Sequence, residues 1–136
     1  MQAKIENPET GRGFCEQFNL ESEISALESH KPWPRGRTSR MLLKTDDLRI
    51  VLIVMQAGAM MEEHHSDGRI SIQVLSGAIR TRMQDQVVDL TPGRLLALDR
   101  SIKHDVEARE DSAFLLTIAW PSDQELIGLK HRGYGS

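Results

Sequence analysis

Apolar and polar residues alternate along most of the segment from Arg40 to Trp120, with the two-residue period of half-buried β-strands. Turn-forming pairs such as Ser76-Gly77 separate the apolar runs. The pattern predicts strands over residues 41–44, 48–55, 70–75, 78–83, 86–90, 94–98, 104–108 and 113–120. No helical pattern lies between these strands to provide the long crossovers of a parallel sheet, so we expect antiparallel strands that close into a sandwich or barrel.

A helical pattern precedes the strands. Asn19 is a good helix N-cap, acidic residues follow in the first turn, and apolar residues recur at helical spacing until two prolines interrupt the chain. Near the other end, Ser122 and Glu125 have capping-box spacing and predict a single helical turn. We therefore divide the chain into an N-terminal extension with a short helix, a barrel and a tail, over residues 1–39, 40–120 and 121–136.

The segment from Gly58 to Gly77 combines a glycine turn, a polar segment with His64, an alternating strand and a second glycine turn. This order resembles the first motif of the cupin superfamily, which is a Gly, five residues, His-x-His, three or four residues, Glu, six residues and Gly. Gly58, His64 and Gly77 fit that spacing. Ser66 stands where the second histidine is expected, and Ile70 where the glutamate is expected.

The second cupin motif, a Gly, five residues, Pro-x-Gly, two residues and His, is matched at Gly93 and His104. Asp99 and Ser101 replace its proline and second glycine. The resemblance covers about residues 40–120 and is to small, single-domain cupins of the cupin type-2 kind, with a degenerate metal motif. It implies an all-β fold, a double-stranded β-helix or jelly-roll barrel, with a site inside. It does not imply one activity, because the superfamily includes enzymes, storage proteins and regulator domains.

Two of the four usual cupin metal ligands remain, His64 and His104. A catalytic ion such as Ni, Mn, Fe or Zn needs at least three protein donors. Regular strand alternation would place Glu62 on the face of His64, so Glu62, or the neighbouring His65, is a conceivable further donor. Without a third donor, the two histidines would instead form hydrogen bonds with water or a small anion at the barrel mouth.

Two functions follow from this altered motif. The first is a small-molecule binding protein with an apolar barrel and a ligand site formed by His64, His104, Ser66 and Ile70. The alternative is a metal-dependent enzyme of the dioxygenase, isomerase or lyase type, with a non-standard metal site. The sequence leaves open whether the protein is an enzyme.

Composition narrows the setting. The chain has 136 residues, a formal net charge of -3 and no long block of like charge, which argues against nucleic-acid binding. Cys15 is the only cysteine, the longest apolar run (residues 50–55) is too short for a membrane span, and no signal peptide is evident, so we expect a cytoplasmic protein. Because the apolar stretch Leu48–Met55 would be unsuitable for an exposed edge strand, we also expect a homodimer that covers such edges.

One pair of basic residues is a separate candidate. Arg80 and Arg82 share a face of their predicted strand and are able to hold a carboxylate or phosphate, but exposed arginines on a sheet are usually solvated, and we expect that here.

Overall fold

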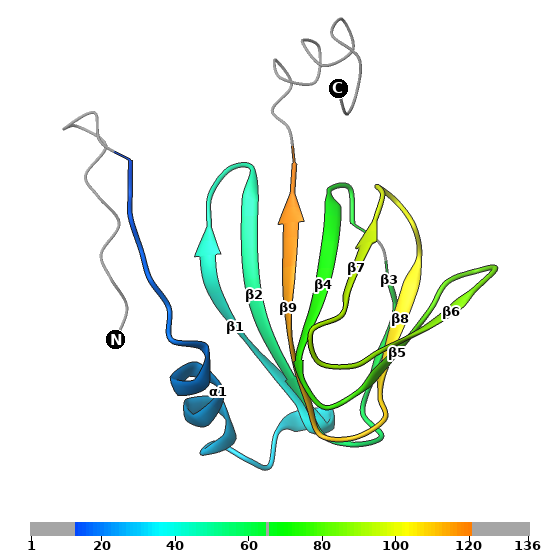
Figure 1. Ribbon diagram of the computed structural model, residues 1–136, viewed down its shortest axis with the longest axis horizontal. Coiled ribbons are helices and arrows are strands. Elements are labelled where there is room, and N and C mark those ends of the chain that lie inside the picture. Colours follow the sequence, from blue (N-terminus) through cyan, green and yellow to red (C-terminus); the bar gives the residue numbers. More distant parts are fainter. Residues whose placement is uncertain (1–12, 65, 121–136) are drawn as a thin grey trace, which may run out of the picture. The chain divides into compact units, whose positions relative to one another are not determined.

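The computed structural model describes residues 13–64 and 66–120, and divides the chain into two compact units, Met1–Lys31 and Pro32–Ser136 (Figure 1). The first unit contains α1 (Leu20–Glu28), whose N-cap Asn19 accepts a hydrogen bond from the backbone N–H of Ser22 at 3.0 Å. The predicted helix is therefore confirmed. The predicted turn at residues 122–125 lies outside the described residues.

The described part of the second unit contains a short 3-10 turn, η2 (Pro34–Gly36), and nine strands. The strands are β1 (Arg37–Lys44), β2 (Leu48–Met55), β3 (Met60–His64), β4 (Arg69–Ser76), β5 (Ile79–Arg82), β6 (Val87–Leu90), β7 (Leu95–Leu98), β8 (His104–Ala108) and β9 (Ser112–Ala119). Eight of them correspond to predicted strands. The sequence did not predict β3, because its residues, Met-Met-Glu-Glu-His, lack the β-branched and large aromatic side chains typical of strands.

The strands form two antiparallel sheets, a five-stranded sheet in the order β1-β2-β9-β4-β7 and a four-stranded sheet in the order β3-β8-β5-β6 (Figure 1). From β2 onward the chain passes repeatedly from one sheet to the other, which is the arrangement of a jelly-roll barrel. The predicted all-β fold is confirmed. Within the described residues, no helix has the length and apolar character that a membrane span requires.

Strand β2 lies inside its sheet, between β1 and β9, and is not an edge. The expectation that Leu48–Met55 is an edge strand that a dimer partner must cover is therefore wrong. The run is apolar throughout because β2 is buried on both faces: Ile53 and Met55 join the core, while Leu52 and Val54, on the opposite face, are also fully buried.

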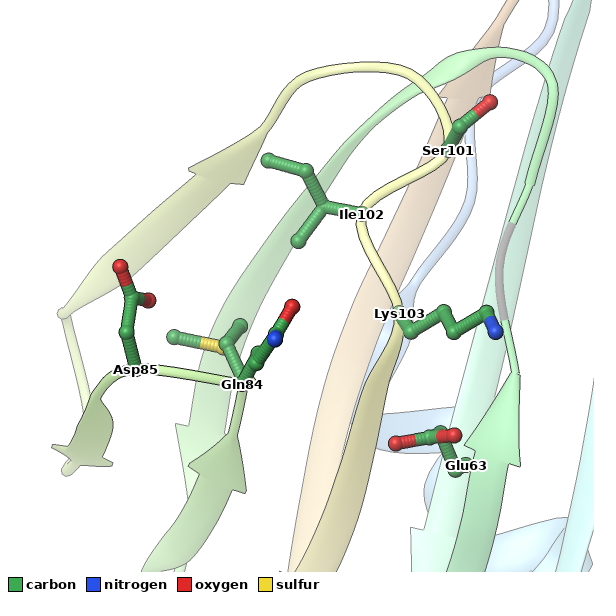
Figure 2. Close-up of a pocket in the computed structure, with 7 residues that line it drawn as sticks. Glu63, Gln84, Asp85, Ser101, Ile102 and Lys103 are labelled. Carbon is green, nitrogen blue, oxygen red and sulfur yellow. The ribbon is translucent and has the colours of Figure 1, made fainter.

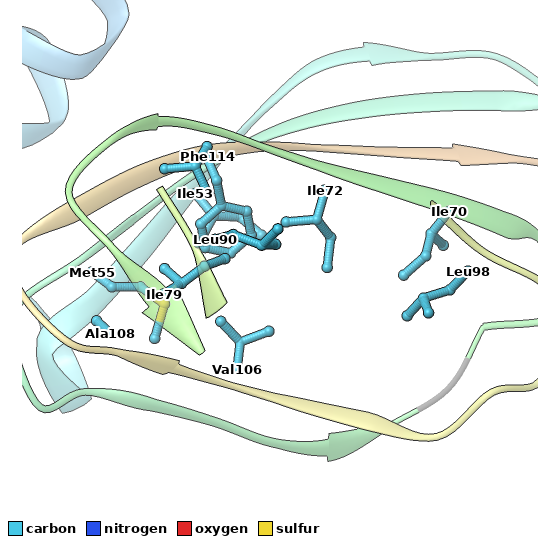
Figure 3. Packing of buried hydrophobic residues seen from close by; sticks show 11 residues of the cluster. Ile53, Met55, Ile70, Ile72, Ile79, Leu90, Leu98, Val106, Ala108 and Phe114 are labelled. Carbon is cyan, nitrogen blue, oxygen red and sulfur yellow. The ribbon is translucent and has the colours of Figure 1, made fainter. Parts of the chain in front are cut away.

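The core fills the space between the two sheets (Figure 3). In β4 the residues Ile70, Ile72 and Val74 are buried while Gln73 is exposed, as the alternation predicted. Figure 3 shows Ile70 and Leu98 beside each other at one end of the cluster, where β4 and β7 pair. The inner face of the five-stranded sheet is therefore apolar where β4 and β7 pair.

The motif glycines occupy turns that need them. Gly58, Gly77 and Gly93 all have positive φ. At Gly77 a Cβ would also lie 2.2 Å from the carbonyl oxygen of Asp111, so any side chain would collide with the backbone. Ser101, which stands where the family pattern has glycine, keeps the glycine conformation at φ 62°.

The outer face of the four-stranded sheet carries charged residues in pairs. Arg80 forms an ion pair with Asp89 at 2.7 Å, and Arg82 bonds to Glu107 and, at 3.4 Å, to Asp105. The acidic partners hold the pKa of Arg80 and Arg82 above the ordinary arginine value, mainly through these side-chain hydrogen bonds. The expectation that both arginines are merely solvated is therefore wrong, since they form a ladder of cross-strand ion pairs.

Candidate functional site

The structure brings His64 and His104 together, as predicted. They are directly opposite each other on β3 and β8, and their ring centroids are 4.4 Å apart with the ring planes tilted by 59°. His104 is only 2% exposed, while His64 is half-buried. The pair therefore lies on the inner face of the four-stranded sheet rather than at an open rim.

A β-bulge in β3 turns His64 inward. Met61 pairs with Val106, but the next pair in the ladder is His64 with His104, so Glu62 and Glu63 together oppose one residue of β8. In a regular strand, Met61 and His64 would point to opposite faces. The bulge places both on the inner face. Because of the bulge, strand alternation no longer predicts that Glu62 lies on the same face as His64. The Glu62 side chain is exposed.

Both imidazole rings are oriented by backbone carbonyls. Nδ1 of His64 lies 2.8 Å from the carbonyl oxygen of Glu62, and Nδ1 of His104 lies 3.0 Å from that of Ile102. A carbonyl only accepts, so each Nδ1 carries the hydrogen and each neutral ring keeps its free lone pair on Nε2. Burial lowers the pKa of His104, although its bond to Ile102 opposes this, and the neighbouring His64 lowers the pKa further. When both rings are neutral, each therefore presents its Nε2 as a hydrogen-bond acceptor.

The other predicted site residues have different roles. The Ser66 hydroxyl accepts from the backbone N–H of Gly68 at 3.1 Å, and the Ser66 carbonyl accepts from the N–H of Ser101 at 2.9 Å, which ties the β3–β4 and β7–β8 connections together. Ile70 is 6% exposed and belongs to the core. His65 lies outside the described residues.

The described residues do not fit a catalytic metal centre. In residues 13–64 and 66–120, no group of three or more His, Cys, Asp or Glu side chains comes close enough together to hold an ion. His64 and His104 supply two nitrogen donors, and a catalytic divalent transition metal needs at least three protein ligands.

Two residues adjacent in sequence to the histidines, Glu63 and Lys103, line an open pocket of about 880 Å³ (Figure 2). Its lining comes from the end of β3, the β5–β6 turn and the β7–β8 connection, and consists of Glu63, Met83, Gln84, Asp85, Ser101, Ile102 and Lys103. Neither His64 nor His104 lines it. A second, smaller cavity of about 270 Å³ lies between β1, β2 and β3 and is lined by Arg37, Thr38, Ser39, Val51, Ile53 and Met61.

Two polar side chains of the inner face were missed by the sequence analysis. Thr81 is 0% exposed, and its hydroxyl oxygen has no hydrogen-bond partner among the described residues, as is also true of Nε of Arg49. Buried polar atoms are normally bonded, so each marks a place where a further polar group fits. The available signal was the alternation itself, because Arg49 has the same parity as the inward-facing Val51, Ile53 and Met55 of β2.

Comparisons with known proteins support the fold. No family model matches the sequence, and no curated protein matches it at a significant level. Solved structures do match. A cupin superfamily protein of Desulfitobacterium hafniense superimposes with a TM-score of 0.62 at 20% identity, over 65% of this chain and 82% of that one. KdgF from Halomonas sp. gives a TM-score of 0.60 at 22% identity, over 71% and 94%.

An RmlC-like cupin of Desulfovibrio desulfuricans is 25% identical, with a TM-score of 0.57, over 65% of this chain and 91% of that one. These similarities establish the class: the barrel has the double-stranded β-helix fold of the cupin superfamily, as the motif resemblance predicted. The particular activity does not follow from them, because similarity at this level of identity shows the fold alone.

Proposed function

We propose that this protein binds a small molecule inside its barrel, with Nε2 of His64 and Nε2 of His104 as the polar anchors. The main support is the fixed orientation of the two rings, which are 4.4 Å apart and each bonded to a carbonyl through Nδ1. The unpartnered hydroxyl of Thr81 and the apolar inner face formed by residues such as Ile70 add to this support. Pockets that bind small molecules combine an apolar lining with a few such polar groups.

The metal-dependent enzyme is the alternative. In its favour, metal-binding histidines usually donate their other nitrogen to a carbonyl or carboxylate, as both rings do here. Against it, the described residues supply two donors only. Calorimetric titration with nickel, manganese and zinc separates the two functions, because a two-histidine site should bind these ions weakly.

The binding proposal is tested by a thermal-shift screen with a panel of small organic acids, amides, alcohols and sugars. We expect at least one class to raise the melting temperature of the wild type, and His64→Gln and His104→Gln to abolish that shift. Lys103→Ala is the matched control, because Lys103 lines the open pocket beside the pair but is not one of the two anchors. A shift that is lost in Lys103→Ala and kept in both histidine variants would place the ligand in the open pocket and contradict the proposal.

A further inference from the structure

Arg49 lies on the inner face of the barrel, in one row with apolar residues. In the five-stranded sheet, Arg49 pairs with Ile118, Ile118 with Ile70, and Ile70 with Leu98. Side chains of directly paired residues point to the same face of a sheet. Ile70 and Leu98 belong to the core and Ile118 packs against it, so the side chain of Arg49 also lies on the inner face.

This row is at the same end of the barrel as the histidine pair. The short connection between His64 and Arg69 leads from the histidine into β4, and the one between Leu98 and His104 leads from β7 to the other histidine. The Ser101 N–H bond to the Ser66 carbonyl joins the two connections. In Figure 1 the start of β4 and the β7–β8 connection lie at the same end of the barrel as the β1–β2 turn, and Arg49 is the second residue of β2.

The charge of Arg49 is not neutralised by any described residue. Its guanidinium carbon lies 4.8 Å from the centre of the Trp120 ring, a cation–π contact that leaves the N–H donors free. Its Nε is buried and has no hydrogen-bond partner among residues 13–64 and 66–120, and no ion pair joins it to Asp46 or Asp47 of the adjacent turn. Lys44 is the residue directly opposite on β1. Like charges in directly opposed positions destabilise a sheet, so an anion between them would be favourable.

A cavity connects the strand of Arg49 with the strand of His64. The cavity of about 270 Å³ is lined by Val51 and Ile53, which follow Arg49 on the inner face of β2, and by Met61, which precedes the bulge on β3. Its size is near the lower limit of small-ligand sites. Arg49 and His64 do not line this cavity themselves, but each lies on a strand that does, and the two strands belong to opposite sheets.

We propose that the barrel binds a small organic carboxylate that also carries a hydroxyl group. This inference rests on the proposed function and names its ligand class. The carboxylate accepts hydrogen bonds from the guanidinium of Arg49, the hydroxyl donates to Nε2 of His64 or His104, and the body of the ligand lies against the apolar row that contains Ile70. Inorganic phosphate fits less well, because it has no apolar body to cover that row and is costly to remove from water.

The test uses 4-hydroxybenzoate and 4-hydroxybutyrate, with the corresponding amides as neutral probes and inorganic phosphate as a second anion. For wild type, calorimetry should show binding of a carboxylate and little or none of its amide. Arg49→Gln should weaken carboxylate binding about tenfold to a hundredfold, the usual effect of losing a hydrogen bond to a charged group. Arg94→Gln, which removes the same charge from an exposed position, should leave it unchanged. If Arg49→Gln fails to fold, Arg49→Lys replaces it and should bind detectably but more weakly, because lysine lacks the planar fork.

Other outcomes separate this inference from the proposed function. Equal binding of acid and amide, lost in His64→Gln but kept in Arg49→Gln, would support a ligand site at the histidines and overturn the role of Arg49. Binding of phosphate without either carboxylate, or of none of the probes by the wild type, would overturn the carboxylate assignment, whereas ligands found in the thermal-shift screen would still support the proposed function.

Discussion

His64 and His104 face each other across β3 and β8 with ring centroids 4.4 Å apart, and each donates its Nδ1 hydrogen to a carbonyl two residues earlier in its own chain segment. The local bonds fix each ring separately, and the strand pairing fixes the rings relative to each other. The pair is therefore set before any ligand arrives, which reduces the ordering cost of binding.

The buried histidine makes folding stability depend on pH. Because the pKa of His104 is lowered from 6.5, mainly by burial, the unfolded chain takes up a proton at higher pH than the folded protein does. Stability is thus fully present above pH 6.5 and decreases as the pH falls toward the folded pKa. Urea melts at pH 7.5 and 5.5 should show this decrease, and His104→Gln should reduce it. This range lies above the titration of Asp89 and Glu107, whose pKa values are lowered by Arg80 and Arg82. Equal stability at both pH values would contradict the prediction.

Restoring the family's missing donors should create a metal site. Ser66→His combined with Ile70→Glu would add two ligands to His64 and His104, and four donors of the usual types would then converge. We expect calorimetry to show nickel, manganese or zinc binding by the double variant that is much tighter than wild-type binding. Ser66→His alone is the control, since it leaves the apolar Ile70 in place. A double variant that binds none of the three ions would show that Ser66 and Ile70 do not occupy the ligand positions.

The strand β4 offers a test of the core. Ile72→Ala and Val74→Ala should each lower the free energy of unfolding by about 2–4 kcal/mol, because both side chains are fully buried and their truncation leaves a cavity. Gln73→Ala, in the same strand but exposed, should cost far less. Denaturant melts that reversed this order would mean that the register of β4 is wrong.

Ser101 should be replaceable with a gain in stability. Its φ of 62° is in the left-handed region, which costs an L-residue about 1–2 kcal/mol. Glycine removes that strain but increases the freedom of the unfolded chain by about 0.4–1 kcal/mol. Ser101→Gly should therefore stabilise the protein by about 0.5–1 kcal/mol in urea melts. A loss of stability would show that the serine side chain contributes more than its backbone costs.

The homodimer stays a prediction, with a different basis from the one that the sequence suggested. Among the described strands, the edges are β1 and β7 in one sheet and β3 and β6 in the other, and Val87 on β6 and Leu95 on β7 are 56% and 58% exposed. We expect light scattering at micromolar concentration to give the mass of a dimer, and Val87→Lys with Leu95→Lys to give a monomer. A wild-type monomer would contradict the prediction.

The sequence predicted strands such as β4 and β8 because apolar and polar side chains alternate along them. It could not predict β3, whose residues reveal neither strand propensity nor the bulge between Met61 and His64. The bulge depends on how β3 pairs with β8, which is a tertiary property. The proximity of His64 and His104 was predicted through the motif resemblance. Local sequence patterns alone do not show which residues distant in the chain become neighbours in the fold.

Charge was harder to interpret than hydrophobicity. Arg80 and Arg49 both lie in strands with apolar neighbours, yet Arg80 lies on the outer face, in a cross-strand ion pair, and Arg49 on the inner face, without one among the described residues. Which acidic residue stands on the adjacent strand decides between the two outcomes. That neighbour is known only once the strand order is known.

The bulge in β3 makes the candidate site depend on the number of residues as well as on their identity. Met61 and His64 are three positions apart, so a β3 that paired regularly with β8 would turn His64 to the outer face although no side chain of the site had changed. Loss of one of the two glutamates would instead leave the histidine two positions after Met61, where regular alternation keeps it on the inner face without a bulge. Among related barrels, an inward histidine therefore requires either this spacing with a bulge or a spacing one residue shorter without one, and the histidine alone is not a sufficient sign of a retained site.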